Sequence, residues 1–560
     1  MKLVECVPNV SEGRDRKILD AIAAVITSVA GVRLLDMDPG AATNRTVFTF
    51  VGPPDAAAEA AFLVIRKAAE LIDMRVHKGA HPRMGATDVC PFVPLGGTTM
   101  SECVDLARKL GRRVADDLGI PVYFYEEAAT RPQRRSLAGI RRGEYEGLPA
   151  KLKDPEWRPD AGPAVFNERS GATVIGAREF LIAYNVNLNT RDRRLANTIA
   201  QNIRETGRPR RGADQKILKD AEGRSLTEDG PSMLPHTRAT GWYIEEYDQA
   251  QVSINLTNFK VTPPHRVFEA VSSEAAALGL RVTGSEVVGL VPLEAMRMAG
   301  RHYLGRQGKS EAAPENELVR MATVSLGLSD VAAFDPAHKI VEYSVAAQGA
   351  LVSMTVSRFA AQVADATPAP GGGSVAALAG SLAAGLCAMV ASISFERKGF
   401  EDRRDVLTRL GLEAHELCGR MLAAVDADAT AFDRVLAAGR MPKAGEEDRR
   451  ARDIALQEAT LAAIEIPLSV MRDALRALQL AGEAAALGVP VTLSDAGVAA
   501  LAAAAAVEGA WYNVRINLPG LTDETLAGPL RQEADTMCAQ AETAKREIGS
   551  RVRKGLDILP

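Results

Sequence analysis

The stretch that decides the fold of the C-terminal part of the chain is Ala366–Phe395, ATPAPGGGSVAALAGSLAAGLCAMVASISF, which contains no charged residue. It is long enough to cross a bilayer, but it consists mostly of Ala, Gly and Ser. Near its start it has the turn-forming run Pro368-Ala-Pro-Gly-Gly-Gly373. A helix that is apolar all round is usually a buried one. We therefore expect a buried helix in a soluble bundle and no membrane span.

The composition on either side of this stretch indicates the same architecture. Residues 354–560 contain 46 alanines but only six aromatic residues, and their helical patterns are broken at Pro442, Pro467, Pro490 and Pro519. Alanine at this density lets helices approach closely. We expect residues 354–560 to form an all-α helical bundle whose faces are shared between subunits, which makes the protein a homo-oligomer.

The N-terminal half alternates between strand and helix patterns in two rounds. The first round has strands at Leu3–Val7, Val32–Asp36, Thr46–Val51, Asp88–Val93 and Val122–Tyr125, and helices after Ser11, at Ala56–Leu71 and at Ser101–Leu118. A second round starts near Thr173, with strands at Phe180–Asn187, Gly241–Tyr247 and Gln251–Asn255 and helices at Arg191–Glu205 and Pro264–Leu278.

A β-α-β-β-α-β order is typical of a ferredoxin-like layer of helices on a sheet. We expect a multidomain chain with two α+β ferredoxin-like subdomains, at residues 1–180 and 181–343. A linker at 344–353 then leads to the helical bundle. The polar stretch Gly207–His236 is interpreted as a surface loop.

Charge and cysteine content restrict the partners and the compartment. The chain has 560 residues and a formal charge of −4, from 67 Lys and Arg against 71 Asp and Glu, so we expect no binding to nucleic acid. Its six cysteines form no C-x-x-C pair, which favours reduced thiols over disulfides or a zinc site. The N-terminus lacks the apolar core of a signal peptide. These features predict a cytoplasmic protein.

The densest polar stretch of the first half is Asp73–Asp88, DMRVHKGAHPRMGATD. His77 and His81 are four residues apart, which on a helix would suggest a metal pair, but Pro82 disfavours helix before it. We expect a loop without a metal. A loop imidazole beside Lys78, Arg83 and Asp88 suits a general base that acts on an anionic substrate. Loop histidines with structural hydrogen bonds are the alternative.

The glycine run Pro370–Ser374 precedes a helix pattern but matches neither a phosphate-binding nor a dinucleotide-binding loop. Backbone N–H groups at the start of that helix can receive an acidic or carbonyl-bearing ligand. The alternative is a helix-entry turn that needs close approach of another segment.

The segment Val425–Phe432, VDADATAF, contains two aspartates that point in different directions on a helix. Asp428 lies on the apolar stripe with Val425 and Phe432, whereas Asp426 is expected to be solvated. A carboxyl on an apolar stripe has a raised pKa and can donate a proton near neutral pH. A buried aspartate in a structural network is the alternative.

Two amides, Asn513 and Asn517, are four residues apart on one predicted helix. They can contact the amide edge of a heterocycle, or they can be ordinary amides at a contact between helices. Their spacing does not distinguish these two interpretations.

Several of these stretches resemble the bifunctional formimidoyltransferase-cyclodeaminase family. The resemblance spans nearly the whole chain in the family's order. Its transferase blocks are Val4–Gly13, Thr43–Thr46 and His77–Phe92, and its cyclodeaminase blocks are Thr367–Ala377, Val425–Phe432 and Tyr512–Leu518.

The resemblance implies two linked reactions of histidine degradation. The first half would transfer a formimidoyl group between N-formimidoyl-L-glutamate and tetrahydrofolate. The second would cyclise 5-formimidoyltetrahydrofolate to 5,10-methenyltetrahydrofolate and release ammonia. Tetrahydrofolate, free or polyglutamylated, would be the co-substrate, and no metal would be needed. The partners would be these small molecules.

The resemblance also implies residue roles. His81 matches the transferase base, and Asp428 matches the cyclodeaminase carboxylate. The folate-binding stretch of the family matches Gly162, Pro163, Ala164, Val165, Phe166, Asn167, Glu168, Arg169, Ser170 and Gly171. Other candidates for contact with substrate or folate are Lys78, Arg83, Gly371, Gly372, Gly373, Ser374, Asn513 and Asn517.

Two alternatives remain for the second half. It could be a methenyltetrahydrofolate cyclohydrolase, which shares the glycine turn and the bundle, or a non-catalytic oligomerisation scaffold. Asp428 argues against the scaffold, because a scaffold gains nothing from burying a carboxyl.

Overall fold

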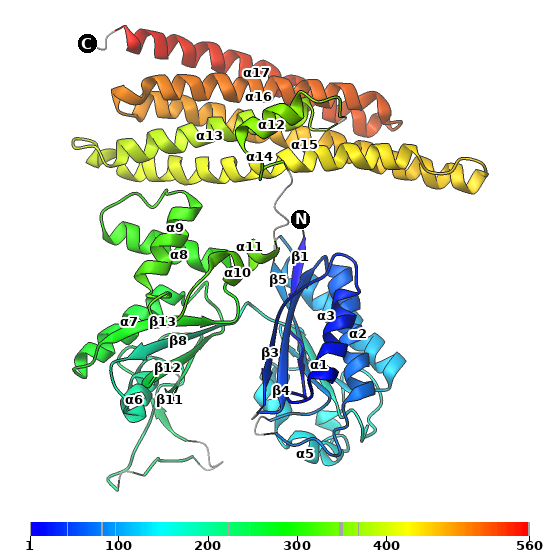
Figure 1. Cartoon of the computed structure of the whole chain (residues 1–560), viewed down its shortest axis with the longest axis vertical. Coiled ribbons are helices and arrows are strands. Elements are labelled where there is room, and N and C mark those ends of the chain that lie inside the picture. The colour runs from blue at the N-terminus through cyan, green and yellow to red at the C-terminus, as the bar shows by residue number, and fades with distance from the viewer. Residues whose placement is uncertain are drawn as a thin grey trace. The chain divides into compact units, whose positions relative to one another are not determined.

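The computed structural model describes residues 2–41, 43–79, 82–95, 97–214, 216–220, 225–245, 247–345, 351–367 and 369–557 (Figure 1). His81 lies outside the described residues. The chain forms two compact units, Met1–Met296 with Thr323–Val345, and Arg297–Ala322 with Ala346–Pro560.

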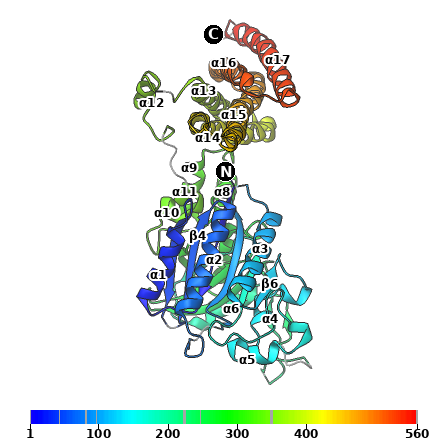
Figure 2. The same cartoon turned by 90° about the vertical axis from the view of Figure 1, so that its right-hand side faces the viewer.

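The first unit begins with a ferredoxin-like sheet. Its strands are β1 (Leu3–Cys6), β2 (Asn9–Val10), β3 (Arg33–Gly40), β4 (Arg45–Gly52) and β5 (Thr87–Leu95), and its helices are α1 (Arg16–Thr27) and α2 (Pro54–Leu71). β1 and β2 lie between β4 and β5, β3 pairs with β4, and all these pairs are antiparallel. The apolar faces of α1 and α2 pack on one side of the sheet, where Phe50 and Phe92 are fully buried (Figure 2).

Helix α3 (Met100–Leu118) follows, and two further strands, β6 (Val122–Glu126) and β7 (Thr173–Ala177), extend this sheet. β7 pairs in parallel with both β5 and β6. The prediction that a second round starts near Thr173 is therefore wrong, because this strand completes the first sheet. All five residues of β7 are buried, so the local pattern shows a central strand without showing which sheet contains it.

The segment between β6 and β7 carries the short helices η1 (Pro132–Arg134), α4 (Leu137–Arg141), α5 (Glu144–Lys151) and η2 (Pro155–Trp157). α4 and α5 pack through Ile140 and Leu148 against a small second core with Val174 of β7. They supply side chains to the loop that precedes β5.

The second sheet repeats the same topology. It contains β8 (Ile182–Leu188), β11 (Thr237–Ile244), β12 (Gln249–Leu256) and β13 (Val282–Val288), with helices α6 (Arg193–Ile203) and α7 (Pro264–Ala277). Its order, β11-β12-β8-β13, is antiparallel throughout and corresponds to β3-β4-β1-β5 in the first sheet. Two α+β ferredoxin-like layers are confirmed.

The polar insertion Gly207–His236 contains a small ribbon of β9 (Arg208–Pro209) and β10 (Thr227–Glu228). Its described residues are mostly exposed, as expected of a surface loop. No sequence pattern in this insertion predicted the ribbon.

Four helices follow β13: α8 (Leu293–Arg306), α9 (Glu315–Ser325), α10 (Pro336–Lys339) and α11 (Val341–Val345). The loop between α8 and α9 packs within the second unit, where Ser392 Oγ donates to the Ala312 carbonyl at 3.0 Å. A β-carbon on Gly411 would lie 2.6 Å from that of Ala312. The range 181–343 therefore contributes to both units.

The second unit is helical, as predicted. Its main helices are α12 (Val356–Val363), α13 (Gly372–Phe395), α14 (Arg404–Gly439), α15 (Glu446–Leu487), α16 (Leu493–Asn517) and α17 (Glu524–Leu556). Many core residues are alanines, among them Ala384 and Ala506. Because there are few bulky side chains between them, α13 packs directly on α14 and α16. A β-carbon on Gly380 would lie 2.5 Å from the Met421 sulfur of α14.

The helix breaks predicted at four prolines are confirmed at three of them. Pro442 separates α14 from α15, and Pro490 and Pro519 lie in the short turns η4 (Pro490–Thr492) and η5 (Leu518–Gly520). The break at Pro467 is wrong, because α15 continues through it and buries it. A proline inside a helix removes one backbone hydrogen bond, and burial of the surrounding apolar face can outweigh that loss.

Within the described part of the chain, three helical segments are long and apolar enough to cross a membrane by length and composition: Gly372–Phe395, Glu446–Leu487 and Pro490–Gly520. About half of each apolar window is buried within the protein, 56%, 44% and 44% respectively. The absence of a membrane span stays a prediction.

Candidate functional site

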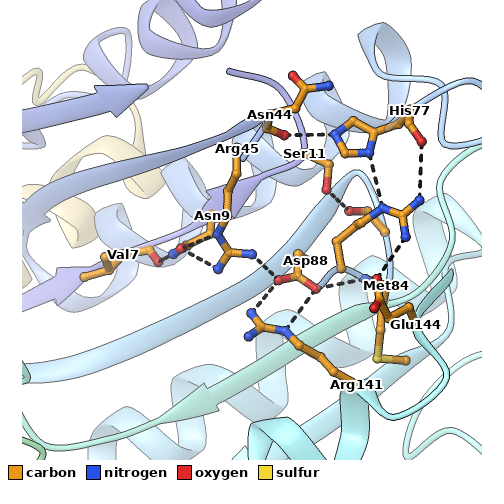
Figure 3. A network of polar contacts seen from close by, with 12 residues as sticks. Val7, Asn9, Ser11, Asn44, Arg45, His77, Met84, Asp88, Arg141 and Glu144 are labelled. Atoms are coloured by element: carbon orange, nitrogen blue, oxygen red, sulfur yellow. Dashed lines mark hydrogen bonds and ion pairs between the residues drawn. The ribbon is translucent and has the colours of Figure 1, made fainter. Parts of the chain in front are cut away.

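A buried carboxylate anchors the loop in front of β5 (Figure 3). Asp88 is fully buried, pairs with Arg45 of β4 and Arg141 of α4, and accepts the Met84 N–H at 2.9 Å. Burial alone would raise the pKa of Asp88, but the two guanidinium groups outweigh it and lower that pKa. Asp88 is therefore a fixed anion that ties this loop to β4 and α4.

Asn44 and His77 fix the other end of the loop. The Asn44 side chain accepts the Gly13 N–H and donates to the Lys78 carbonyl, each at 3.0 Å. His77 Nε2 donates to the Asn44 carbonyl at 2.9 Å, and its Nδ1 accepts from Arg83 at 3.3 Å. Burial, together with Arg83, lowers the pKa of His77.

The described residues from His77 to Ala86 form a loop, as predicted, and β5 begins at Thr87. Among the described residues no group of three His, Cys, Asp or Glu side chains lies close enough to hold a metal ion. His81, the predicted base, lies outside the described residues, so the structure describes neither its contacts nor a pair with His77. A site without a metal stays a prediction.

Arg83 and Lys78 line a cavity of about 500 Å³ together with Gly79, Gly143, Glu144 and Glu146. Arg83 donates to Glu144 and Glu146 of α5 at 2.7–3.1 Å and to the His77 carbonyl at 3.3 Å. The hydrogen bonds to Glu146 are the main cause of the raised pKa of Arg83. Arg83 thus already has carboxylate partners within the chain.

The predicted folate-binding stretch Gly162–Gly171 is a loop beside the same site. The Met74 N–H donates to the Arg169 carbonyl and the Ala86 N–H to the Ser170 carbonyl, both at 2.9 Å. A β-carbon on Gly85 would lie 2.5 Å from the Ser170 oxygen, so glycine is needed for this approach. The structure brings the predicted folate stretch and the polar loop together.

Members of this stretch differ in exposure. Residues 162–165 are exposed, with Val165 at 67%, whereas Phe166 packs its ring on Tyr145 at a centroid distance of 5.3 Å. Asn167 accepts the Ser170 N–H at 2.9 Å, and Arg169 donates to carbonyls at the end of α2. Residues 162–165 can therefore contact a ligand, whereas Phe166, Asn167 and Arg169 hold the loop.

Reasoning from residues missed Arg45, Arg141, Asn44 and Glu146 as parts of this site. Arg141 is 53 residues from Asp88, and no local pattern links them. Asn44 and Arg45 belong to the Thr43–Thr46 motif, whose only signal was the family resemblance. Asn44 adopts a positive φ of 49°, which asparagine tolerates better than most residues.

The second candidate site lies at the start of α13. Ser374 Oγ lies 2.9 Å from the Val425 carbonyl and 3.1 Å from Asp428 Oδ2, both on α14. A β-carbon on Gly373 would lie 2.5 Å from the Asp428 carboxyl carbon. The glycine run is therefore both a helix-entry turn and one wall of the Asp428 environment.

Asp428 is half-buried, as its place on the stripe predicted. Burial raises its pKa, and hydrogen bonds from the Ser374 side chain and backbone partly oppose that rise. The stripe itself is less uniform than expected, since Val425 is buried but Phe432 is 39% exposed.

Asp426 is not solvated, and that prediction is wrong. It is half-buried and accepts the N–H groups of Leu351 at 2.9 Å and Val352 at 3.2 Å. Residues 351 and 352 are 75 and 74 positions away, so helix periodicity alone does not reveal this contact.

The two asparagines of α16 separate in space. A β-carbon on Gly372 would lie 3.4 Å from Asn513 Nδ2, which donates to the Gly509 carbonyl at 2.8 Å, so Asn513 adjoins the glycine turn. Asn517 instead donates to the Ala463 carbonyl of α15 at 3.1 Å. Gly371 caps α13, and an added β-carbon would meet nothing within 4 Å there.

Comparisons with known proteins cover both sites. Family models match residues 3–178 (formiminotransferase domain, N-terminal subdomain), 183–346 (formiminotransferase domain) and 355–536 (formiminotransferase-cyclodeaminase). The formimidoyltransferase-cyclodeaminase of Rattus norvegicus is 43% identical over 546 residues, 97% of each chain.

Two shorter relatives match the halves separately. The glutamate formimidoyltransferase of Thermoplasma acidophilum is 45% identical over 313 residues, 56% of this chain and 95% of that protein. The methenyltetrahydrofolate cyclohydrolase of Methylorubrum extorquens is 34% identical over 200 residues, 36% of this chain and 96% of that protein.

Proposed function

This chain is a bifunctional enzyme that belongs to the formimidoyltransferase-cyclodeaminase family, and we propose how its two halves divide the chemistry. The N-terminal half transfers a formimidoyl group between N-formimidoyl-L-glutamate and tetrahydrofolate. The helical half cyclises 5-formimidoyltetrahydrofolate to 5,10-methenyltetrahydrofolate and releases ammonia. The observation that carries the proposal is the match to a bifunctional relative over 97% of both chains.

In the transfer reaction His81 takes the proton from the attacking folate nitrogen, since an imidazole can act as a base at neutral pH. Asp88 and Asn44 hold the described parts of the loop on either side of it. Lys78 offers a cation to the substrate carboxylates. Arg83 can exchange the 65% exposed Glu146 for a substrate carboxylate. Gly162–Gly171 contacts the folate.

In the cyclisation N10 of the folate attacks the amidine carbon, and its proton passes to the Asp428 carboxylate. The resulting acid then protonates the amino group, the carbon–nitrogen bond to that group breaks, and ammonia leaves. A carboxyl with a raised pKa suits this exchange near neutral pH. The exposed Gly372 and the neighbouring Asn513 offer polar contacts to the folate.

A second candidate for the helical half is hydrolysis of methenyltetrahydrofolate. The 34% identity to the Methylorubrum extorquens cyclohydrolase over 96% of that protein favours it. Both reactions would use the same glycine turn and Asp428. Ammonia release from 5-formimidoyltetrahydrofolate distinguishes cyclodeaminase from cyclohydrolase activity.

The proposal includes a homo-oligomer formed through the helical unit. Val375, Leu382 and Met389 lie seven residues apart on α13, and all are between 37% and 60% exposed. Such a stripe on a helix is typical of a surface that pairs with another helix. A monomeric mass by light scattering would contradict this part of the proposal. The proposal further includes a cytoplasmic place in histidine degradation and tetrahydrofolate in free or polyglutamylated form.

The two-site assignment is tested with both substrates, following methenyl absorbance and ammonia. Asp428→Asn is expected to abolish ammonia release and leave formimidoyl transfer intact. His81→Ala is expected to abolish transfer and still cyclise added 5-formimidoyltetrahydrofolate. Asp426→Asn, two residues away on the same helix, is the matched control and keeps both activities. Equal loss of both activities in either site variant contradicts the assignment.

A further inference from the structure

The Ser374 hydroxyl lies between two acceptors on α14. Its oxygen is 2.9 Å from the Val425 carbonyl and 3.1 Å from Asp428 Oδ2, and the side chain is fully buried. A hydroxyl has one proton and two lone pairs, so Ser374 can donate to only one of these oxygens at a time.

The protonation state of Asp428 decides which bond forms. When Asp428 is ionised, Ser374 donates to the carboxylate, and the bond to Val425 is lost. That loss costs little, because Val425 lies inside α14, where its carbonyl also accepts a backbone hydrogen bond of the helix. When Asp428 is protonated, Ser374 donates to the Val425 carbonyl and accepts from the new O–H group. A rotation of one hydroxyl therefore satisfies both states.

We propose that Ser374 is a positioning residue that holds the Asp428 carboxyl in one place through both protonation states of the cyclisation. This inference rests on the proposed function, in which Asp428 takes the N10 proton and gives it to the leaving amino group. The proton moves between folate and Asp428, and Ser374 neither gains nor loses one. Ser374 thus hydrogen-bonds the acid–base group without touching the reacting atoms.

The surroundings of Asp428 leave this role to Ser374. α13 contains no charged residue between Gly372 and Phe395, and among the described residues only Ser374 opposes the effect of burial on the pKa of Asp428. On α14 itself, Asp426 is bound to the backbone of residues 351 and 352. The charged groups on the neighbouring helices have other partners. On α16, Glu508 accepts a hydrogen bond from Tyr512, and Arg515 pairs with Asp535. On α15, Glu465 interacts with Arg472.

The same pair of helices contains a matched control. Ser381, two turns further along α13, is also buried and donates to the Cys418 carbonyl of α14 at 3.1 Å. Cys418 is seven residues before Val425, so the two serines make equivalent contacts between the helices. Only Ser374 has a carboxyl within reach among its hydrogen-bond partners.

The test measures cyclisation by full-length Ser374→Ala and Ser381→Ala against pH. Removing the Ser374 hydroxyl removes an interaction that favours the ionised carboxylate. The acidic limb of kcat is expected to move to higher pH in Ser374→Ala, with kcat lowered about tenfold and KM for 5-formimidoyltetrahydrofolate unchanged. Ser381→Ala is expected to keep the wild-type profile. An unmoved acidic limb in Ser374→Ala, or an equal shift in Ser381→Ala, overturns the proposal.

A second measurement does not depend on activity. The infrared C=O band of protonated Asp428 is the band that Asp428→Asn lacks, and its titration is compared between the wild type and Ser374→Ala. The proposal requires the titration to move to higher pH in Ser374→Ala, and an unchanged titration overturns it. A wild type that releases no ammonia contradicts the proposed function instead, and the infrared result still decides whether Ser374 holds the carboxyl.

Discussion

Asp88 is fully buried and Asp428 is half-buried, yet their pKa values move in opposite directions. Asp88 lies between Arg45 and Arg141, and its pKa is lowered although burial opposes this. Asp428 receives only uncharged donors from Ser374, and burial raises its pKa. Burial acts in the same direction on both groups, so the difference comes from the neighbouring charges.

The comparison shows two ways to fix a polar side chain. In the transferase half, charged partners favour the ionised form of Asp88, which suits an anchor. In the helical half, Gly373 leaves room for the Asp428 carboxyl and the Ser374 hydroxyl hydrogen-bonds to it without fixing its charge. Such an arrangement suits a group that exchanges a proton.

The largest effect is expected from a substitution that removes the charge of Asp88. Asp88→Asn leaves the largely buried guanidinium groups of Arg45 and Arg141 without their carboxylate. We expect it to lower the local free energy of unfolding around β5 by about 3–5 kcal/mol. Hydrogen exchange of the β5 amides measures this loss. Because the pKa of Asp88 is lowered by folding, the wild-type advantage is complete above about pH 4 and disappears as pH falls through the folded pKa.

The control for this change is Asp20→Asn, which removes an exposed pair with Arg16 on α1. Exposed pairs of this kind contribute only about 0.3–0.5 kcal/mol. Equal effects of the two substitutions would show that the buried pair does not anchor the loop.

The next largest effect is expected from a substitution that fills the space beside the Asp428 carboxyl. Gly373→Ala puts a methyl group 2.5 Å from the Asp428 carboxyl carbon, so the carboxyl or the helix must move. A displacement of about 1 Å at a catalytic group can cost on the order of 100-fold in rate. We expect that loss in ammonia release, with formimidoyl transfer unchanged.

Gly385→Ala on the same helix is the matched control, since an added β-carbon meets nothing within 4 Å there. It should keep the cyclisation rate. A Gly373→Ala variant with full cyclisation activity would contradict the role of the missing β-carbon.

The smallest effect is expected from Asp428→Asn, which should change stability in the opposite direction to Asp88→Asn. Because folding raises the pKa of Asp428, stability falls as pH rises from the unfolded pKa of about 3.9 through the folded pKa. Asp428→Asn removes the ionised form and is expected to stabilise α13 and α14 at neutral pH by about 0.5–2 kcal/mol. Hydrogen exchange of these helices, corrected for pH, measures the change. Destabilisation at pH 7, as expected for Asp88→Asn, would contradict it.

Local pattern predicted much of the architecture. The β-α-β-β-α-β orders and the alanine-rich helices follow from the spacing of apolar residues, which sets the faces that must be buried. The pattern failed where a choice depended on a distant partner. The sheet that receives β7 and the continuity of α15 through Pro467 are examples.

The candidate sites divide in the same way. Asp428 stood out because a carboxyl on an apolar stripe is unusual, and the glycine run stood out by composition. That Gly373 and Ser374 adjoin this carboxyl depends on the packing of α13 on α14. The residue pattern around His77 and His81 suggests a general base, and the family resemblance assigns that role to His81. Gly162–Gly171 is assigned a function only by that resemblance.

The sequence by itself determined the two kinds of architecture, the family and the residue types available for acid–base chemistry, because these depend on composition, periodicity and motif. Only the tertiary structure decided which groups surround each carboxyl. Arg141 reaches Asp88 across 53 residues, and Ser374 reaches Asp428 across 54. Since a pKa responds to neighbours in space, the difference between a carboxyl with a lowered pKa and one with a raised pKa arises only when the chain is folded.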